Sequence, residues 1–185
     1  MSKRSVCVYC GARFGKNSTY LATAETLGKS LADCNWRLVY GAGDVGLMGA
    51  VARAAQDAGG ETFGVIPTHL INQEVGKTDL THFIVTETMH ERKKVMFVNA
   101  DAVVVLPGGA GSLDEFFEVL TWRQLGLHDK PIILINADSY WSPLLGLLEH
   151  IVDQGFADAN VLDFITVVPD AETAINALKE TFDHL

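Results

Sequence analysis

The chain has 185 residues, of which 48% are hydrophobic and 20% charged, and its formal net charge is −9. This length and composition suit one packed domain over residues 1–185 and exclude a disordered chain. The acidic balance excludes a broad nucleic-acid surface, which needs clustered Lys and Arg, but allows a small phosphorylated ligand. No apolar run approaches the ~20 residues of a membrane span, and residues 1–15 lack the apolar part of a signal peptide. We therefore expect a cytoplasmic protein with neither a nucleic-acid nor a membrane partner.

Apolar, β-rich runs alternate with helical patterns along the chain. The expected strand and helix pairs are 5–10 with 19–34, 36–40 with 47–59, 82–87 with 89–100, 102–107 with 113–127, 131–136 with 141–155 and 164–169 with 171–182, with a further strand at 62–67. Such alternation predicts βαβ units, and uniformly apolar strands are typical of a sheet covered on both faces. The predicted fold class is α/β, a doubly wound parallel sheet, in which ligands bind at the carboxyl ends of the strands.

The first predicted strand contains the pattern "CVYC", formed by Cys7 and Cys10. In a strand, a spacing of three places the two thiols on opposite faces, whereas a redox or zinc motif needs both on one turn. We therefore interpret both cysteines as small buried hydrophobic residues.

A glycine-rich turn follows the second predicted strand. Gly41, Gly43 and Gly46 have G-x-G-x-x-G spacing, which is typical of a dinucleotide site. The next strand should then end in an acid that holds the ribose, but it ends in Pro67 and is followed by Thr68. Two interpretations stay open with equal weight: a turn that contacts a phosphate, or a tight turn without a ligand.

A stronger anion-binding pattern is "PGGAGS", which begins at Pro107 directly after an apolar strand. Its three glycines free the backbone to present several N–H groups to an anion. The pattern lacks the G-K-[ST] ending of a P-loop, so hydrolysis of a nucleoside triphosphate is not expected.

Acidic residues follow this loop. Ser112 and Glu115 have the spacing of a capping box, and Asp114 would favour the first turn of a helix. On spacing alone, capping is favoured over catalysis for Glu115.

Thr88 and Glu91 form a second capping-box pattern, which is followed at once by Arg92 and Lys93. Cations near a helix start oppose the helix dipole. A solvated basic patch or a bound anion could account for them, and the anion accounts for them better. His90, beside them, has no neighbours at metal-ligand spacing, so we expect no metal site.

These motifs, taken together, resemble the Lonely Guy (LOG) family, which has also been labelled lysine decarboxylase-like. The family pattern PGGxGTxxE corresponds to "PGGAGSLDE", GGGxxGLMG corresponds to "GAGDVGLMG", and an HxRK-type helix start corresponds to "MHERKK". The resemblance extends from about Val6 to the last helix.

The resemblance implies a Rossmann-like homodimer without a cofactor. The implied activity is hydrolysis of the N-glycosidic bond of nucleoside 5′-monophosphates, AMP or cytokinin riboside 5′-monophosphates, with release of the base and ribose 5-phosphate. Arg92 and Glu115 match the family's catalytic pair, and Glu74 matches a residue near the substrate. The positions that match nucleotide contacts are Lys93, Gly108, Gly109, Ala110, Gly111, Ser112, Asp114 and Thr121. The alternative is a non-catalytic nucleotide-binding or sensor protein on the same fold.

Three positions depart from the family pattern. Ala42 replaces a glycine, Ser112 replaces a threonine, and Asp114 stands where plant members often have Glu. A methyl group at Ala42, in a tight turn, would narrow the pocket beside it, and the preference between AMP and a cytokinin nucleotide stays open. A decarboxylase would need pyridoxal phosphate on a lysine, and the sequence has no lysine in such a setting.

The helix expected at 113–127 carries more apolar residues than one helical stripe. They are Leu113, Phe116, Phe117, Val119, Leu120, Trp122 and Leu125. One sheet cannot bury them all, so the surplus predicts a partner, most simply a second copy of the chain.

Overall fold

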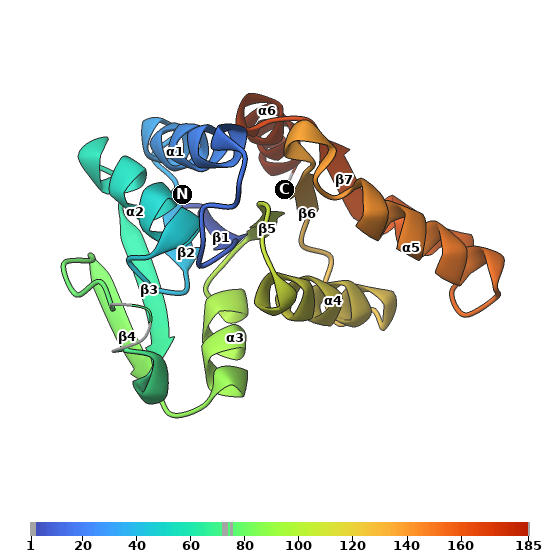
Figure 1. The fold of residues 1–185 in the computed structure, drawn as a ribbon, viewed down its shortest axis with the longest axis horizontal. Helices are drawn as coiled ribbons and strands as arrows, with labels where there is room; N and C mark the ends of the chain where they lie inside the picture. Colours follow the sequence, from blue (N-terminus) through green and yellow to red (C-terminus); the bar gives the residue numbers. More distant parts are fainter. Residues whose placement is uncertain (1–2, 72–73, 75, 185) are drawn as a thin grey trace.

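The computed structural model describes residues 3–71, 74 and 76–184. Seven parallel strands form one sheet in the order β4-β3-β2-β1-β5-β6-β7 (Figure 1). The strands are β1 (Ser5–Tyr9), β2 (Arg37–Tyr40), β3 (Thr62–Pro67), β4 (His82–Thr86), β5 (Ala102–Val105), β6 (Ile132–Ile135) and β7 (Ile165–Val168). The doubly wound parallel sheet predicted from the sequence is therefore confirmed.

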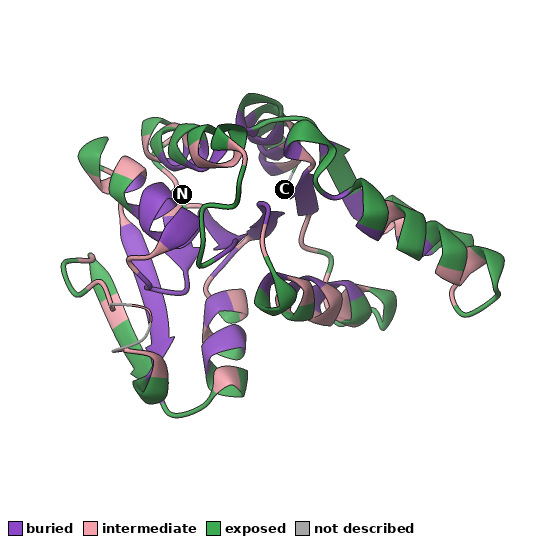
Figure 2. Ribbon diagram, viewed as in Figure 1, coloured by how far each residue is buried: buried purple, intermediate pink, exposed green. Residues whose placement is uncertain are grey.

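Helices cover both faces of the sheet. One face carries α1 (Ser18–Asp33), α2 (Gly46–Asp57) and α6 (Ala171–Asp183), and the other carries α3 (Met89–Val98), α4 (Ala110–Gln124) and α5 (Ser142–Asp153). Three short 3-10 segments are η1 (Thr68–Leu70), η2 (Ala137–Ser139) and η3 (Ala159–Phe164). Figure 2 shows that the central strands are buried and that the helices expose their outer sides. Among the described residues, no helix is long and apolar enough to cross a membrane.

Alternation along β1 divides the core into two layers. Val6 and Val8 pack under α1 and α2, while Cys7 and Tyr9 pack under α3 and α4. Cys10 returns to the first layer, so the two thiols lie on opposite faces as predicted. Burial raises the pKa of both thiols. They remain protonated and behave as small hydrophobic residues.

The order of the strands creates a switch point at the centre of the sheet. From β1 the chain proceeds to β2 on one side, whereas from β5 it proceeds to β6 on the other. The loops after β1 and β5 therefore diverge and leave a crevice between them. The backbone N–H of Gly11 donates to the carbonyl of Pro107 at 3.0 Å, so the two loops are joined at the floor of this crevice.

Candidate active site

A cavity of about 430 Å³ opens at this switch point. The loops after β1, β2 and β5 line it, together with side chains from α2, α3 and α4. The predicted site residues on its wall are Gly41, Glu74, Arg92, Gly108, Gly109, Gly111, Ser112, Asp114 and Glu115. The predicted residues that do not line it are Gly43, Gly46, Lys93, Ala110 and Thr121. The structure thus gathers most of the predicted site, from four separate segments, around one space.

The loop between β5 and α4 fits an anion-binding role. Gly108 is required by packing, because a Cβ there would lie 2.0 Å from the Oγ of Ser112. A Cβ at Gly109 or Gly111 would meet no protein atom within 4 Å, so these two glycines face open space. Gly109 is the N-cap of α4, and no side chain caps the helix there. The first N–H groups of the helix, which have no intrahelical partner, are therefore free to bind a ligand.

The capping box expected at Ser112 and Glu115 is wrong. Helix α4 begins at Ala110, so Ser112 already lies in its first turn and Glu115 in its second. The loop is shorter than expected because Gly109 takes the N-cap position. Glu115 is thereby released from a local role, and its partly buried side chain lines the cavity. The other capping box is confirmed: the Glu91 N–H donates to Thr88, and the Thr88 N–H donates to Glu91.

Arg92 is buried, with 4% of its surface exposed, so a solvated basic patch is excluded for it. Its guanidinium donates to the carbonyls of Val65 (3.1 Å) and Gly41 (2.6 Å) and to the carboxylate of Glu74 (2.9 Å). A Cβ at Gly41 would lie 2.1 Å from the Arg92 Nη2 atom. This glycine therefore admits the guanidinium to the cavity wall.

Lys93 is also buried, but it faces α4 and does not line the cavity. Its ammonium donates to Asp114 at 2.9 Å and to Glu118 at 2.6 Å. Burial alone would lower the pKa of Lys93, but the two carboxylates outweigh it and hold the pKa above its usual value. A charged lysine thus joins α3 to the first turns of α4. The nucleotide contacts expected for Lys93, Ala110 and Thr121 stay predictions.

Burial raises the pKa of Glu115 to about 7. The positive charge of Arg92 opposes this shift, and the carboxylates of Asp114 and Glu74 add to it. A carboxyl group that titrates near neutrality in a cavity is typical of a catalytic acid or base.

The glycine-rich turn after β2 has a structural role in this arrangement. Gly43 and Gly46 do not line the cavity, and the loop after β1 covers the start of α2, where the Leu47 N–H donates to the Gly11 carbonyl. The tight-turn alternative is therefore favoured over a phosphate-contacting turn for these two glycines. Ala42 has a φ of +57°, and its methyl group packs against Gly64 of β3. The methyl group thus does not narrow the cavity.

The residues of the cavity wall that sequence reasoning missed include Arg13 and Phe14 in the loop after β1, and Tyr140 beyond η2. The Tyr140 hydroxyl donates to the Gly108 carbonyl at 2.6 Å and so supports the β5–α4 loop. The position of "GARFG" at the carboxyl end of the first strand was the available signal, because ligands in this fold bind at such ends. Tyr140 carried no comparable signal, since its contact with Gly108 spans distant parts of the chain.

The described residues offer few groups that could hold a metal ion or form a Schiff base with pyridoxal phosphate. Within residues 3–71, 74 and 76–184, no cluster of three or more His, Cys, Asp or Glu side chains could hold a metal ion. Of the described residues that line the cavity, none is a lysine. Lys93, the buried lysine beside the cavity, is held as a charged ammonium and has no free electron pair for a Schiff base.

The fold and the site together define the class. This is a Rossmann-like α/β protein with an uncapped, glycine-rich helix start and a carboxyl group of raised pKa at the switch point.

Comparison with known proteins gives the family. The family model described as "possible lysine decarboxylase" matches residues 48–178. A cytokinin riboside 5′-monophosphate phosphoribohydrolase of Rhodococcoides fascians is 44% identical over 177 residues, which cover 95% of this chain and 89% of that protein. The Arabidopsis thaliana protein LOG3, which carries the same enzyme name, is 40% identical and covers 96% of this chain and 82% of its own length. The chain belongs to this family, the LOG family.

Solved structures share the architecture. The molybdenum cofactor binding protein from Rippkaea orientalis superimposes with a TM-score of 0.75 at 24% identity, over 98% of this chain and 99% of that one. The molybdenum cofactor carrier protein from Chlamydomonas reinhardtii has a TM-score of 0.75 at 23% identity, with the same coverage. At such low identities the likeness shows the fold alone.

The position of Glu115 predicts how stability depends on pH. Its pKa is raised from 4.5 in the unfolded chain to about 7 in the folded state, so the stability it contributes when protonated is lost as the pH rises through about 7. Glu115→Gln cannot ionise and should be more stable than the wild type. The advantage should be about 2 kcal/mol larger at a pH of about 8.5 than at about 5.5. Urea unfolding at both pH values measures this difference.

Glu91→Gln is the matched control, because glutamine also fills the N3 place of a capping box. Its stability relative to the wild type should not change between the two pH values. An equal response of the two variants to pH would contradict the raised pKa of Glu115.

Proposed function

We propose that this protein hydrolyses the N-glycosidic bond of nucleoside 5′-monophosphates, AMP or cytokinin riboside 5′-monophosphates, and releases the free base and ribose 5-phosphate. The observation that carries the proposal is the placement of Glu115 on the same cavity wall as the uncapped start of α4. A phosphate-binding element and a titratable carboxyl group then lie a few residues apart, as a sugar phosphate requires. The enzyme names of the relatives that are 40% and 44% identical support the same activity.

The 5′-phosphate binds at the β5–α4 loop in this proposal. The free N–H groups at the start of α4 and the positive end of its dipole favour an anion, and the open space beside Gly109 and Gly111 admits its oxygens. The ribose then extends toward Glu115. An apolar wall that includes Met48, Met89 and Met96 is available to the base. Flexible thioether side chains adapt to different shapes, so this wall does not decide between adenine and a modified base.

Hydrolysis proceeds through a transition state in which positive charge develops on the ribose ring as the bond from C1′ to the base nitrogen breaks. An ionised Glu115 stabilises this charge or takes a proton from the attacking water, whose oxygen bonds to C1′. The base leaves with the bonding electron pair and acquires a proton. Arg92, which also lines the cavity, orients the nucleotide and offsets the negative charge of the departing base. Asp114, already paired with Lys93, contacts the ribose.

The activity itself is tested by chromatography of the base released from AMP and from adenosine. AMP should be cleaved and adenosine should be a poor substrate, because only AMP uses the β5–α4 loop.

Turnover should rise as the pH increases through about 7, since Glu115 acts in its ionised form. Glu115→Gln should lose turnover by roughly 10²-fold or more while still binding AMP. A wild-type protein that binds AMP without releasing adenine would instead support the alternative, a non-catalytic nucleotide-binding or sensor protein.

A substitution at Gly111 tests whether the phosphate binds beside this residue, separately from any effect on folding. Gly111→Ala adds a methyl group on the cavity side of α4, where no protein atom is displaced, so stability should be unchanged or rise by about 0.5 kcal/mol. The kcat/KM for AMP should fall by roughly 10-fold or more, because the methyl group occupies space assigned to the phosphate.

Gly146→Ala is the control, since Gly146 lies inside α5, also faces open space and does not line the cavity. It should raise stability by up to about 1 kcal/mol and leave hydrolysis unchanged. If both variants keep full activity, the phosphate does not bind beside Gly111.

A homodimer remains part of the proposal. Helix α4 buries more of its apolar residues than the sequence predicts, because Phe116, Val119 and Leu120 lie in the core. Leu125, the C-cap of α4, and Leu127, just beyond the helix, each remain 68% exposed. The partner is therefore expected at the end of α4 rather than along its whole length.

Light scattering at micromolar concentration should give the mass of two chains, and the double variant Leu125→Ser with Leu127→Ser should shift it toward one. A monomeric wild type would contradict the dimer.

The cytoplasmic location expected from the sequence also stays a prediction.

A further inference from the structure

Neither Arg92 nor Lys93 is free to pair with the proposed 5′-phosphate. The phosphate of a nucleoside monophosphate carries a charge between about −1.5 and −2 at neutral pH, by analogy with other phosphate monoesters. Arg92 is already bound to Glu74 and to two carbonyl oxygens. Lys93 is bound to two carboxylates and does not line the cavity. The backbone N–H groups of the β5–α4 loop supply partial charges only.

Arg13 is the remaining cationic side chain on the wall of the cavity, within the part of the chain that the structure describes. It is exposed, and among the described residues its guanidinium has no ion pair, hydrogen bond or aromatic partner. An arginine that meets no protein group retains all five of its N–H donors for a ligand.

The backbone around Arg13 is fixed, although its side chain is not engaged. The N–H of Gly11 is bonded to the carbonyl of Pro107, which directly precedes the glycines of the β5–α4 loop. On the other side, the Arg13 backbone lies so close to Gly46 that a Cβ at Gly46 would be 2.2 Å from the Arg13 nitrogen. The loop after β1 is therefore held between the β5–α4 loop and the start of α2. The base of the arginine is anchored beside the proposed phosphate position.

We propose that Arg13 binds the 5′-phosphate and is the residue that makes the site specific for nucleotides over nucleosides. This inference rests on the proposed function, because it assigns a contact to the same substrate. The planar guanidinium pairs with two phosphate oxygens at once and supplies the full positive charge that the loop lacks.

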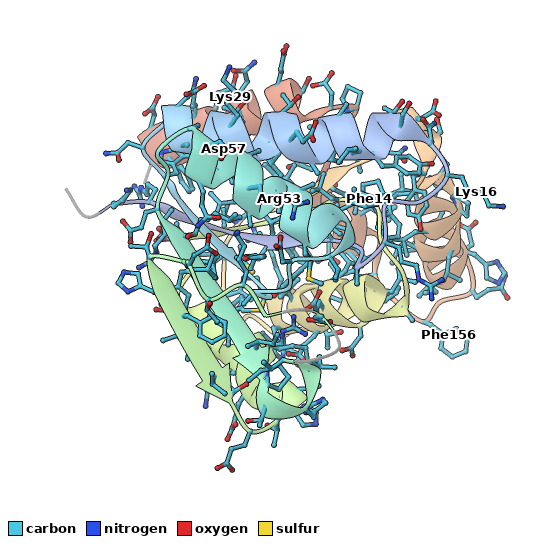
Figure 3. All side chains as sticks on the ribbon, turned by 60° about the vertical axis from the view of Figure 1, so that its left-hand side comes forward. Phe14, Lys16, Lys29, Arg53, Asp57 and Phe156 are labelled. Atoms are coloured by element: carbon cyan, nitrogen blue, oxygen red, sulfur yellow. The ribbon has the colours of Figure 1, made fainter. Side chains whose placement is uncertain are left out.

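Lys16 provides a matched control on the same loop. It is a cation three positions further along the chain, it is exposed, and it does not line the cavity. Figure 3 shows its side chain at the outer edge of the molecule, pointing away from the body of the fold. Removal of Lys16 changes the net charge by the same amount as removal of Arg13. A difference between the two variants therefore reports position rather than overall charge.

The experiment compares Arg13→Ala, Arg13→Lys and Lys16→Ala with the wild type. Base release gives kcat/KM for AMP and for adenosine, and calorimetry gives the affinity for AMP and for ribose 5-phosphate. Arg13→Ala should lower kcat/KM for AMP and both affinities by about 10- to 100-fold, as expected for one lost hydrogen-bonded charge contact. Its low kcat/KM for adenosine should not change. Arg13→Lys should lie between, and Lys16→Ala should match the wild type.

Two results would overturn the role of Arg13. One is an equal loss for AMP and adenosine in Arg13→Ala, which would place the residue at the sugar or the base. The other is an unchanged affinity for ribose 5-phosphate in that variant. Failure of the proposed function is recognised separately, because a wild type that releases no base can still be compared with Arg13→Ala by calorimetry. A wild type that binds neither AMP nor ribose 5-phosphate would refute both proposals.

Discussion

The buried guanidinium of Arg92 is the interaction on which the site depends. A charge in the interior is tolerated only when its hydrogen-bonding capacity is met, and here the acceptors come from the end of β2, from β3 and from Glu74 in the connection after η1. One side chain on α3 therefore fixes three segments that are distant in sequence. Removal of Arg92 would leave Glu74 and two carbonyl oxygens without their donor. The cation that faces the proposed substrate is also the one that assembles the wall around it.

The pairing of charges also determines the pKa of Glu115. The two cations that act on the pKa of Glu115 are already paired, Arg92 with Glu74 and Lys93 with Asp114 and Glu118. Neither is available to neutralise Glu115 fully, so burial prevails and the pKa of its carboxyl rises to about 7. A cation that paired with Glu115 would instead lower its pKa. The paired cations keep the carboxyl group poised between its two states.

Local sequence patterns predict the helices and strands well, but only part of the candidate site. Strand and helix positions followed from apolar runs, because tertiary packing and local periodicity agree in a covered parallel sheet. The two capping-box patterns show the limit: Thr88 and Glu91 form one, whereas Ser112 and Glu115 do not, because a glycine starts α4 three residues earlier. The spacing is the same, and only the length of the preceding loop differs. Likewise, the position of Arg92 in its helix pointed to an anion, but its burial and its bond to Glu74 depend on contacts between segments that no short pattern encodes.

The unequal surroundings of the glycines in the β5–α4 loop bear on how this protein can diverge. A side chain at Gly108 would clash with Ser112 and disturb the loop. Gly109 and Gly111 face empty space, so single substitutions at these positions reshape the site without a penalty to folding. Mutations at these two positions can therefore change which ligand binds while the fold is kept. Folding and substrate choice therefore depend on different residues within residues 107–112, so one can change without the other.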